Sequence, residues 1–132
     1  MNPEEFLNKK NKIAIVGVSN NRQKWGSKIY NELKAQGFSV YPINPKHKKI
    51  GYGTCYPDLE ALPEKPGLVI TVVPPGATEK VVKQCMELGI EKVWMQPGSE
   101  SEKAIKFCKH NGIRAIYNSC FVANKPGAGK KE

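Results

Sequence analysis

The feature that most constrains the fold of this chain is an uninterrupted apolar run that stops at a glycine. Residues 13–16 read Ile-Ala-Ile-Val, and Gly17 then opens a polar, basic loop that extends to Gly26. A short apolar run without alternation is typical of a strand buried on both faces of a parallel sheet. Because glycine has no side chain, backbone N–H groups and the next helix N-terminus can approach an anion here. The stretch therefore predicts a strand that leads into a phosphate-sized loop.

Apolar runs alternate with helical patterns along the rest of the chain. Strands are expected at residues 12–16, 39–43, 53–56, 68–73, 92–95 and 113–117, and helices at residues 27–36 and 77–88 and after residue 99. The Ser-x-x-Glu spacing of Ser99 and Glu102 predicts a capping box at the start of the last helix. This alternation predicts an α/β fold with a doubly wound, mainly parallel sheet and helices on both faces. The expected strand order is 3-2-1-4-5-6, with a short strand 3.

In a sheet of this kind, ligands bind beyond the carboxyl ends of the strands, where the strand order reverses. The loops at Gly17, Asn44, Pro74 and Gln96 are therefore expected to share one rim. A length of 132 residues suits one domain. We expect this domain to span residues 12–123, between an N-terminal helical extension (1–11) and a basic flexible tail (124–132).

The charge of the chain points to an anionic partner. There are 21 Lys and Arg against 12 Asp and Glu, which gives a net charge of +9. Only Arg22 and Arg114 are arginines, and Lys lacks the planar fork that reads guanine edges. The composition therefore argues against a specific nucleic-acid partner. No apolar run approaches the roughly 20 residues that a transmembrane helix needs, so no membrane partner is expected.

The cysteines favour a cytoplasmic location. The four cysteines form no C-x-x-C pair, and no apolar N-terminal segment resembles a signal peptide. Cys120 follows the last expected strand on the rim side, where it could meet a ligand thiol or have a purely structural role. A reducing compartment is the expectation for such a chain.

The loop after Gly17 carries groups that suit a pyrophosphate. It offers backbone donors, the Ser19 hydroxyl, and the cations Arg22 and Lys24. The alternative is that Gly17 only permits a tight turn, because every strand-to-helix turn in such a fold needs something similar. The loop has no complete G-x-G-x-x-G pattern, since Ser19 stands where the second glycine would be.

The end of the second strand sharpens the expected ligand. An NAD site usually has Asp or Glu here to hold the ribose hydroxyl, whereas this chain has Asn44, Pro45 and Lys46. A cation favours an additional phosphate on the ribose, as in coenzyme A or NADP. Lys48 and Lys49 are interpreted as a solvated face. Pro74 supplies either an apolar wall for an adenine ring or pantetheine arm, or only a rigid loop. The same two interpretations, ligand contact or rigid loop, apply to Gln96-Pro97-Gly98.

The sequence offers little catalytic equipment. Asp58 is the single aspartate, and His47 and His110 are the only histidines. No metal-ligand cluster, carboxylate pair or Ser-His-Asp set can be assembled from these residues. This favours a binding module over an enzyme.

Five motifs in order resemble a known family. They are Ile-Val-Gly-Val-Ser-Asn, Tyr-Pro-Ile-Asn-Pro-Lys, Val-Val-Pro-Pro, Trp-Met-Gln-Pro-Gly and Asn-Ser-Cys. Over about residues 12–121 the chain resembles the stand-alone CoA-binding domain proteins, and the Rossmann-type amino-terminal domain of succinyl-CoA synthetase alpha subunits. The loop lacks the proline of many members, and the synthetase's catalytic histidine belongs to a second domain that is missing here.

The resemblance implies coenzyme A as the cofactor and assigns its contacts. The implied binding residues are Gly17, Val18, Ser19 and Lys24 near the pyrophosphate, Asn44, Pro45 and Lys46 near the adenosine and its 3′-phosphate, Val73 and Pro74 along the adenine or pantetheine, and Gln96, Pro97, Gly98 and Cys120 farther along the rim. From the loop itself, Asn20 and Arg22 are also expected to bind the cofactor. The leading hypothesis is a cytoplasmic protein that binds coenzyme A or an acyl-CoA without an evident catalytic centre. The alternatives are an NAD(P)-binding redox-sensing module and a basic nucleic-acid accessory protein. A protein partner is left unidentified.

Overall fold

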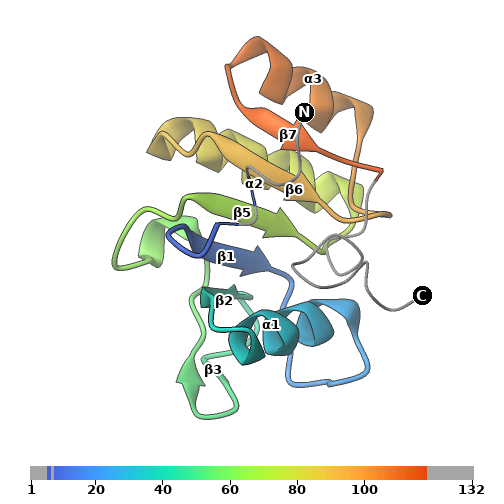
Figure 1. Ribbon diagram of the computed structural model, residues 1–132. Coiled ribbons are helices and arrows are strands. Elements are labelled where there is room, and N and C mark those ends of the chain that lie inside the picture. Colours follow the sequence, from blue (N-terminus) through green and yellow to red (C-terminus); the bar gives the residue numbers. More distant parts are fainter. Residues whose placement is uncertain (1–5, 7, 119–132) are drawn as a thin grey trace, which may run out of the picture.

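The computed structural model describes residue 6 and residues 8–118, which form a five-stranded parallel sheet with helices on both faces (Figure 1). The strand order is β2-β1-β5-β6-β7. The strands are β1 (Lys12–Val16), β2 (Ser39–Ile43), β5 (Leu68–Thr71), β6 (Lys92–Met95) and β7 (Arg114–Ile116), and the helices are α1 (Trp25–Ala35), α2 (Pro75–Leu88), α3 (Glu102–His110) and the 3-10 helix η2 (Leu59–Ala61). The predicted doubly wound α/β fold is confirmed.

The expected third strand is reduced to a single point of contact. Tyr56 makes one parallel bridge to Ile43 of β2 and extends no further along that strand. Gly53–Thr54 (β4) instead pairs antiparallel with Lys49–Ile50 (β3) in a separate two-stranded hairpin. Gly51, with φ +60°, allows the tight turn between them. The sequence therefore predicts this region's extended backbone but not its pairing.

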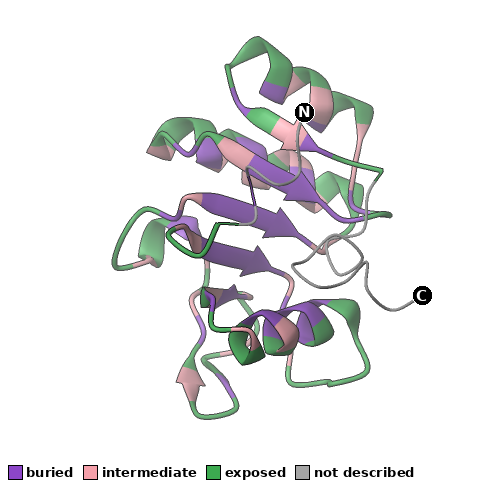
Figure 2. Ribbon diagram, viewed as in Figure 1, coloured by how far each residue is buried: buried purple, intermediate pink, exposed green. Residues whose placement is uncertain are grey.

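The sheet separates two hydrophobic cores, because side chains of successive strand residues point to opposite faces. Ile13 and Ile15 of β1 pack on the face that α1 covers, together with Ile29 and Leu33 of that helix. Ala14 and Val16 pack on the face of α2 and α3. Figure 2 shows the central strands as buried, β5 along its whole length and β1 from Ile13 onward. The unbroken apolar pattern of β1 follows from this two-sided burial.

The start of α3 differs from the prediction. Ser101, and not Ser99, is the N-cap, and its Oγ accepts a hydrogen bond from the Ala104 N–H at 2.9 Å. Ser99 is buried, and its Oγ donates to the Thr71 carbonyl at 3.0 Å and lies 2.8 Å from the Thr71 hydroxyl. Because Ser99 is occupied at the end of β5, the helix begins two residues later than the capping-box pattern predicts.

The N-terminal segment contacts the body through one aromatic side chain. Phe6 is fully buried, and its ring packs edge-on against Trp94 of β6 with centroids 6.1 Å apart. Residues 8–11 form a turn, in which the Asn11 N–H donates to the Asn8 carbonyl at 2.9 Å. The rest of the predicted helical extension, the predicted tail and Cys120 lie outside the described residues. Among the described helices, none is long and apolar enough to cross a membrane.

Candidate functional site

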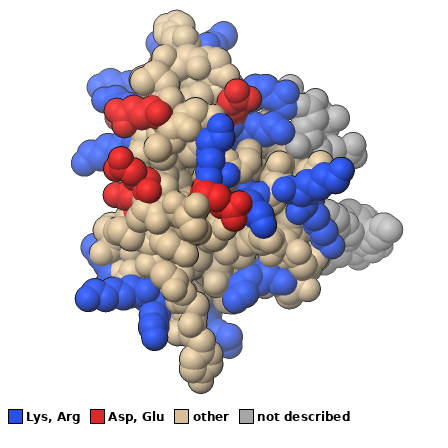
Figure 3. Space-filling model, turned by 90° about the vertical axis from the view of Figure 1, so that its left-hand side faces the viewer, with Lys and Arg blue, Asp and Glu red and all other residues tan. Residues whose placement is uncertain are grey.

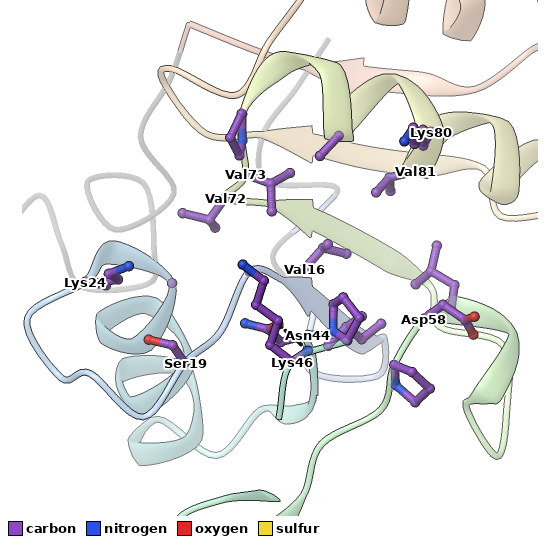
Figure 4. Close-up of a pocket in the computed structure, with 18 of the residues that line it drawn as sticks. Val16, Ser19, Lys24, Asn44, Lys46, Asp58, Val72, Val73, Lys80 and Val81 are labelled. Atoms are coloured by element: carbon purple, nitrogen blue, oxygen red, sulfur yellow. Dashed lines mark hydrogen bonds between the residues drawn. The ribbon is translucent and has the colours of Figure 1, made fainter. Parts of the chain in front are cut away.

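A pocket of about 880 Å³ opens at the carboxyl ends of β2, β1 and β5 (Figure 4). It lies at the switch point between β1 and β5, where the order of the strands reverses, since α1 follows β1 on one face and α2 follows β5 on the other. Its lining residues are Val16, Gly17, Ser19, Gln23, Lys24, Trp25, Gly26, Ile43, Asn44, Pro45, Lys46, Pro57, Asp58, Leu59, Val72, Val73, Pro74, Ala77, Lys80, Val81 and Gln84. Apolar side chains form most of this lining, with cations among them.

Two glycines bring the loop and the start of α1 against the sheet. Gly17 has φ +110°, and a Cβ at this position would lie 2.3 Å from the Val72 carbonyl oxygen. A Cβ on Gly26, in the first turn of α1, would lie 2.1 Å from the Gly17 carbonyl oxygen. Such distances leave no room for a side chain at either position. The close packing holds the N-terminus of α1 at the pocket.

The N-terminus of α1 has no side-chain cap. Its N-cap residue is Lys24, which makes no capping hydrogen bond, and its first turn contains no acidic residue. The first N–H groups of a helix have no partner within the helix, and the helix dipole places partial positive charge there. This end of α1 is therefore suited to an anionic group of a ligand.

The loop before α1 is ordered by its own polar side chains. The Ser19 Oγ accepts from the Asn21 N–H at 3.1 Å, and the Asn21 Oδ1 accepts from the Gln23 N–H at 2.9 Å. Asn20 points elsewhere: its Nδ2 donates to the Lys49 carbonyl and its Oδ1 accepts from the Gly51 N–H, both at 3.0 Å. Asn20 thus anchors the β3–β4 hairpin to the loop and does not line the pocket.

Asn44 joins the end of β2 to the loop after β1. Its Nδ2 donates to the Val18 carbonyl at 2.9 Å, and its Oδ1 accepts from the Lys46 N–H at the same distance. Its carbonyl also accepts from the Cys55 thiol, with 3.7 Å between the atoms. Asn44 therefore positions Lys46, whose side chain extends from the end of β2 into the pocket in Figure 4.

Three lysines from three different elements surround the pocket, namely Lys24, Lys46 and Lys80. Asp58 is the one carboxylate among the lining residues, and its Oδ1 accepts from the Ala61 N–H at 3.0 Å as the N-cap of η2. Gln84 of α2 holds the same segment, since its Oε1 accepts from the Leu59 N–H at 3.1 Å. The pocket therefore combines an apolar lining with an excess of positive charge.

Eight of the predicted site residues line this pocket: Gly17, Ser19, Lys24, Asn44, Pro45, Lys46, Val73 and Pro74. Val18 is fully buried beneath the loop, and Arg22 lines a separate depression beside Trp25. Gln96, Pro97 and Gly98 do not line the pocket, and Gln96 is buried at the end of β6. Cys120 lies outside the described residues.

Sequence reasoning missed the wall that α2 and the segment before β5 contribute. Ala77, Lys80, Val81 and Gln84 recur at helical spacing, so they share the face of α2 that lines the pocket. This spacing was the available signal, but it does not tell which face of α2 meets the sheet and which the pocket. Pro57 and Leu59 carry no sequence signal that would place them here.

None of the described cysteines lines this pocket, and burial favours the protonated form of their thiols. Burial raises the pKa of Cys85 to about 12 and that of Cys108 to about 11. Burial also raises the pKa of Cys55, against the effect of its hydrogen bond to Asn44. A thiol that keeps its proton is a poor nucleophile and a poor metal ligand. In residues 6 and 8–118, no group of three or more His, Cys, Asp or Glu could hold a metal ion.

The fold and the pocket define a small α/β domain with a lysine-bearing pocket at the switch point of a parallel sheet. Comparison with known families shows to which family of such domains the chain belongs. The sequence profile of the CoA binding domain family matches residues 11–126, so the chain belongs to that family.

Relatives of known name are ligases that contain a similar domain. The alpha subunit of acetate–CoA ligase (ADP-forming) II from Pyrococcus furiosus is 29% identical over 119 residues, which cover 82% of this chain and 26% of the subunit. Acetate–CoA ligase (ADP-forming) II from Archaeoglobus fulgidus is 30% identical over 114 residues, which cover 77% of this chain and 17% of the ligase. The chain therefore spans only about a sixth to a quarter of the length of these relatives.

Solved structures include proteins of similar size. A conserved hypothetical protein from Pyrococcus furiosus shares 36% identity and a TM-score of 0.83, and the match covers 86% of this chain and 98% of that protein. The apo form of acetyl-coenzyme A synthetase 1 from Ca. Korarchaeum cryptofilum matches with 27% identity and a TM-score of 0.74, covering 86% of this chain and 27% of the synthetase. The domain thus occurs both by itself and within larger enzymes.

Proposed function

We propose that this protein binds coenzyme A or an acyl-CoA in the pocket at the carboxyl ends of β2, β1 and β5. The observation that carries the proposal is the combination of an apolar pocket of about 880 Å³ with Lys24, Lys46 and the uncapped start of α1. Pockets of about 300 to 1,000 Å³ are usual for cofactor-sized ligands. Membership of the CoA binding domain family supports the choice of ligand.

Each part of coenzyme A has a complementary part of the pocket. The pyrophosphate suits the backbone N–H groups at the start of α1 and the Lys24 ammonium. The apolar residues Val72, Val73 and Pro74 suit the adenine ring or the pantetheine arm. Lys46 suits the 3′-phosphate, because a lysine ammonium is a compact charge that pairs well with phosphate.

The function that we propose is ligand binding without chemistry by the described residues. The named ligases are several times longer than this chain, so their activity is not transferred to it. Delivery of the ligand to a partner enzyme is compatible with this proposal. A cytoplasmic location stays a prediction from the cysteine pattern.

Calorimetry with coenzyme A and 3′-dephospho-CoA tests the role of Lys46. Lys46→Ala is expected to weaken coenzyme A binding by about 1.5 to 3 kcal/mol, the value of a charge-assisted hydrogen bond, and to leave 3′-dephospho-CoA binding unchanged. Lys48→Ala is the matched control, because this exposed lysine lies two residues away and does not line the pocket.

Two results would contradict the proposal at different levels. Equal affinity of the wild-type protein for the two ligands would remove the role of Lys46 while retaining the site. No binding of either ligand, together with tight binding of NADP, would replace coenzyme A by a dinucleotide and favour the redox-sensing alternative.

A further inference from the structure

The net charge of the protein is confined to one half of the chain. Residues 8–57 contain ten Lys and Arg and a single acidic residue, Glu32, so this half carries the whole net charge of +9. Residues 58–118 contain eight basic and eight acidic residues, and the remaining ends are also balanced. The first half forms β1, α1, β2 and the β3–β4 hairpin. An uneven distribution of this size indicates an anionic partner for one side of the molecule.

The uneven distribution is visible on the surface. Figure 3 keeps the vertical direction of Figure 1, in which the β3–β4 hairpin lies at the lower end. On the face that Figure 3 shows, acidic side chains lie over the middle and upper parts, and the charged side chains toward the lower end are Lys and Arg. The positive charge is therefore not scattered evenly around the protein.

Two shallow depressions lie on adjoining sides of α1 within this basic half. One, of about 450 Å³, is lined by Arg22, Trp25, Lys28, Asn31, Glu32 and Ala35. The other, of about 260 Å³, runs between α1 and the hairpin, and its lining includes Arg22, Asn31, Lys34 and Tyr52. Arg22 and Asn31 line both depressions, so the two adjoin each other. We call the surface formed by Arg22, Trp25, Lys28, Asn31, Lys34 and Tyr52 the α1–hairpin surface.

An exposed aromatic ring stands at each end of the α1–hairpin surface. Trp25 is 56% exposed, and Tyr52, at the tip of the hairpin, is fully exposed. Tyr52 therefore has no packing role in the described fold. The two hydrogen bonds from Asn20 to Lys49 and Gly51 tie the hairpin to the loop before α1. The backbone of the hairpin is thus held beside this loop, and Tyr52 and Lys34 both line the depression between α1 and the hairpin.

The kind of partner follows from the order of these groups. A protein interface normally has a contiguous apolar centre, whereas here the two rings are separated by the polar residues Arg22, Asn31 and Lys34. Sites for single-stranded nucleic acid combine positive charge along the backbone path with isolated aromatic platforms on which bases stack. The predominance of lysine fits phosphate contacts without sequence reading.

We propose that the α1–hairpin surface binds single-stranded nucleic acid without sequence preference. Lys28 and Lys34 contact phosphates, and Tyr52 provides a platform for a base. The site extends beyond the coenzyme A pocket, but the two adjoin, because Trp25 lines both the pocket and the depression on one side of α1, and Ser19 lines both the pocket and the depression beside the hairpin. The proposal does not depend on coenzyme A as the ligand of that pocket.

Fluorescence anisotropy with a labelled oligothymidylate of about ten nucleotides, within the usual site size, tests the proposal in the full chain. An abasic strand of equal length presents the same phosphates without bases, and polyglutamate presents the charge of an acidic protein. The wild-type protein is expected to bind oligothymidylate about tenfold more tightly than the abasic strand, because base stacking contributes to one of them only. Equal affinity for all three polyanions would overturn the proposal.

Substitutions separate the contribution of stacking from that of charge. Tyr52→Ala is expected to lower oligothymidylate affinity about tenfold and to leave abasic-strand affinity unchanged. Tyr117→Ala, which removes another exposed aromatic ring beyond β7, is the control and should change neither. Loss of both affinities alike, or of neither, in the Tyr52→Ala protein would contradict the stacking role.

The charge contribution is measured by salt dependence. Lys28→Gln/Lys34→Gln should make the slope of log affinity against log salt shallower by about 1.4, because each phosphate contact on a single strand contributes about 0.7. Lys83→Gln/Lys103→Gln alters net charge equally at exposed positions of α2 and α3, and should leave the slope unchanged. Equal slopes for the two double variants would indicate attraction by net charge alone and would refute a site.

Coenzyme A titrations of the same proteins separate the two proposals. Tyr52→Ala and Lys28→Gln/Lys34→Gln should keep wild-type affinity for coenzyme A, since none of the three residues lines its pocket. Retained coenzyme A binding with no strand binding by the wild-type protein would overturn the nucleic-acid site and leave the pocket assignment intact.

Discussion

Helices α1 and α3 both follow strands of one sheet, but they begin in opposite ways. α3 has Ser101 as a hydrogen-bonding N-cap, Glu102 in its first turn, and Lys109 and His110 in its last turn. These charges complement the helix dipole at both ends. α1 has Lys24 as its N-cap residue, which makes no capping hydrogen bond, and no acidic residue in its first turn. The positive end of α1 is therefore available to a ligand, whereas the N-terminus of α3 is already capped by its own side chains.

The two halves of the chain differ in their net charge, as the two helix starts do. Residues 8–57 carry the entire net charge of +9, and residues 58–118 are balanced. The second half also buries its described thiols between α2, α3 and the sheet, where they serve as small apolar side chains. In both comparisons, unbalanced positive charge lies in the first half of the chain, whereas the charges of the second half are balanced.

The largest effect is expected from a methyl group in the first-half loop. Gly17→Ala should lower the free energy of unfolding by about 3 kcal/mol or more, because the new Cβ meets the Val72 carbonyl and the positive φ is strained. Urea denaturation measures the loss. The matched control is Gly76→Ala in α2, where a Cβ meets nothing within 4 Å and should stabilise the protein by about 0.5 kcal/mol. Similar urea midpoints for the two variants would show that the loop tolerates displacement from β5.

An intermediate effect on stability is expected at alkaline pH, because a buried thiol of the second half then titrates in the unfolded chain. Burial raises the pKa of the Cys85 thiol from its ordinary value of 9.0 to about 12. Above pH 9 the unfolded chain loses this proton and the folded protein keeps it, so stability is complete below pH 9 and falls as the pH rises toward 12. The loss from this thiol approaches 1.4 kcal/mol per pH unit.

Urea denaturation at a series of pH values checks this loss. In the Cys85→Ala protein the decline above pH 9 should be shallower, because one of the protonated buried thiols is gone. Cys108, whose pKa burial also raises, should maintain part of the decline. An unchanged pH slope in the Cys85→Ala protein would contradict this assignment.

The smallest effect tests the difference between the two helix starts directly. Lys24→Asp supplies α1 with a capping carboxylate and should raise the free energy of unfolding by about 0.5 to 1 kcal/mol. It should also weaken coenzyme A binding, because a negative charge then occupies the proposed pyrophosphate position. Ser101→Ala is the converse variant and should lower stability by about 1 kcal/mol without affecting binding. A less stable Lys24→Asp protein, or one with wild-type coenzyme A affinity, would remove the functional explanation for the missing cap.

Much of the fold is predictable from the sequence because its local signals agree with one another. The predicted bounds of β1, β2 and β6 equal the observed ones, since each strand ends where its mainly apolar segment ends and begins at the polar residue just before that segment. The signals fail where two residues compete for one role. Ser99 and Ser101 both suit an N-cap, and the choice depends on Thr71, which lies 28 residues from Ser99 in the sequence.

The residues of the candidate site likewise fall into those that the sequence predicts and those that it does not. Gly17, Asn44 and Pro74 were predicted to meet because the carboxyl ends of neighbouring parallel strands lie at one edge of a sheet. Gln96 follows β6, one strand further from the switch point, and does not line the pocket. Lys80 and Gln84 were missed because the face that α2 presents depends on how it packs against its neighbours.

By itself, the sequence determined the alternation of strands and helices, the close turn at Gly17 and the cation at Lys46 after β2. These follow from properties of the local chain, namely apolar periodicity, the absent glycine side chain and the position of a residue beyond a strand end. Only the tertiary structure decided which loops form the pocket, which serine caps α3, and how Trp25 and Tyr52 lie on one basic surface. Those outcomes depend on contacts between residues far apart in the chain, which no local pattern contains.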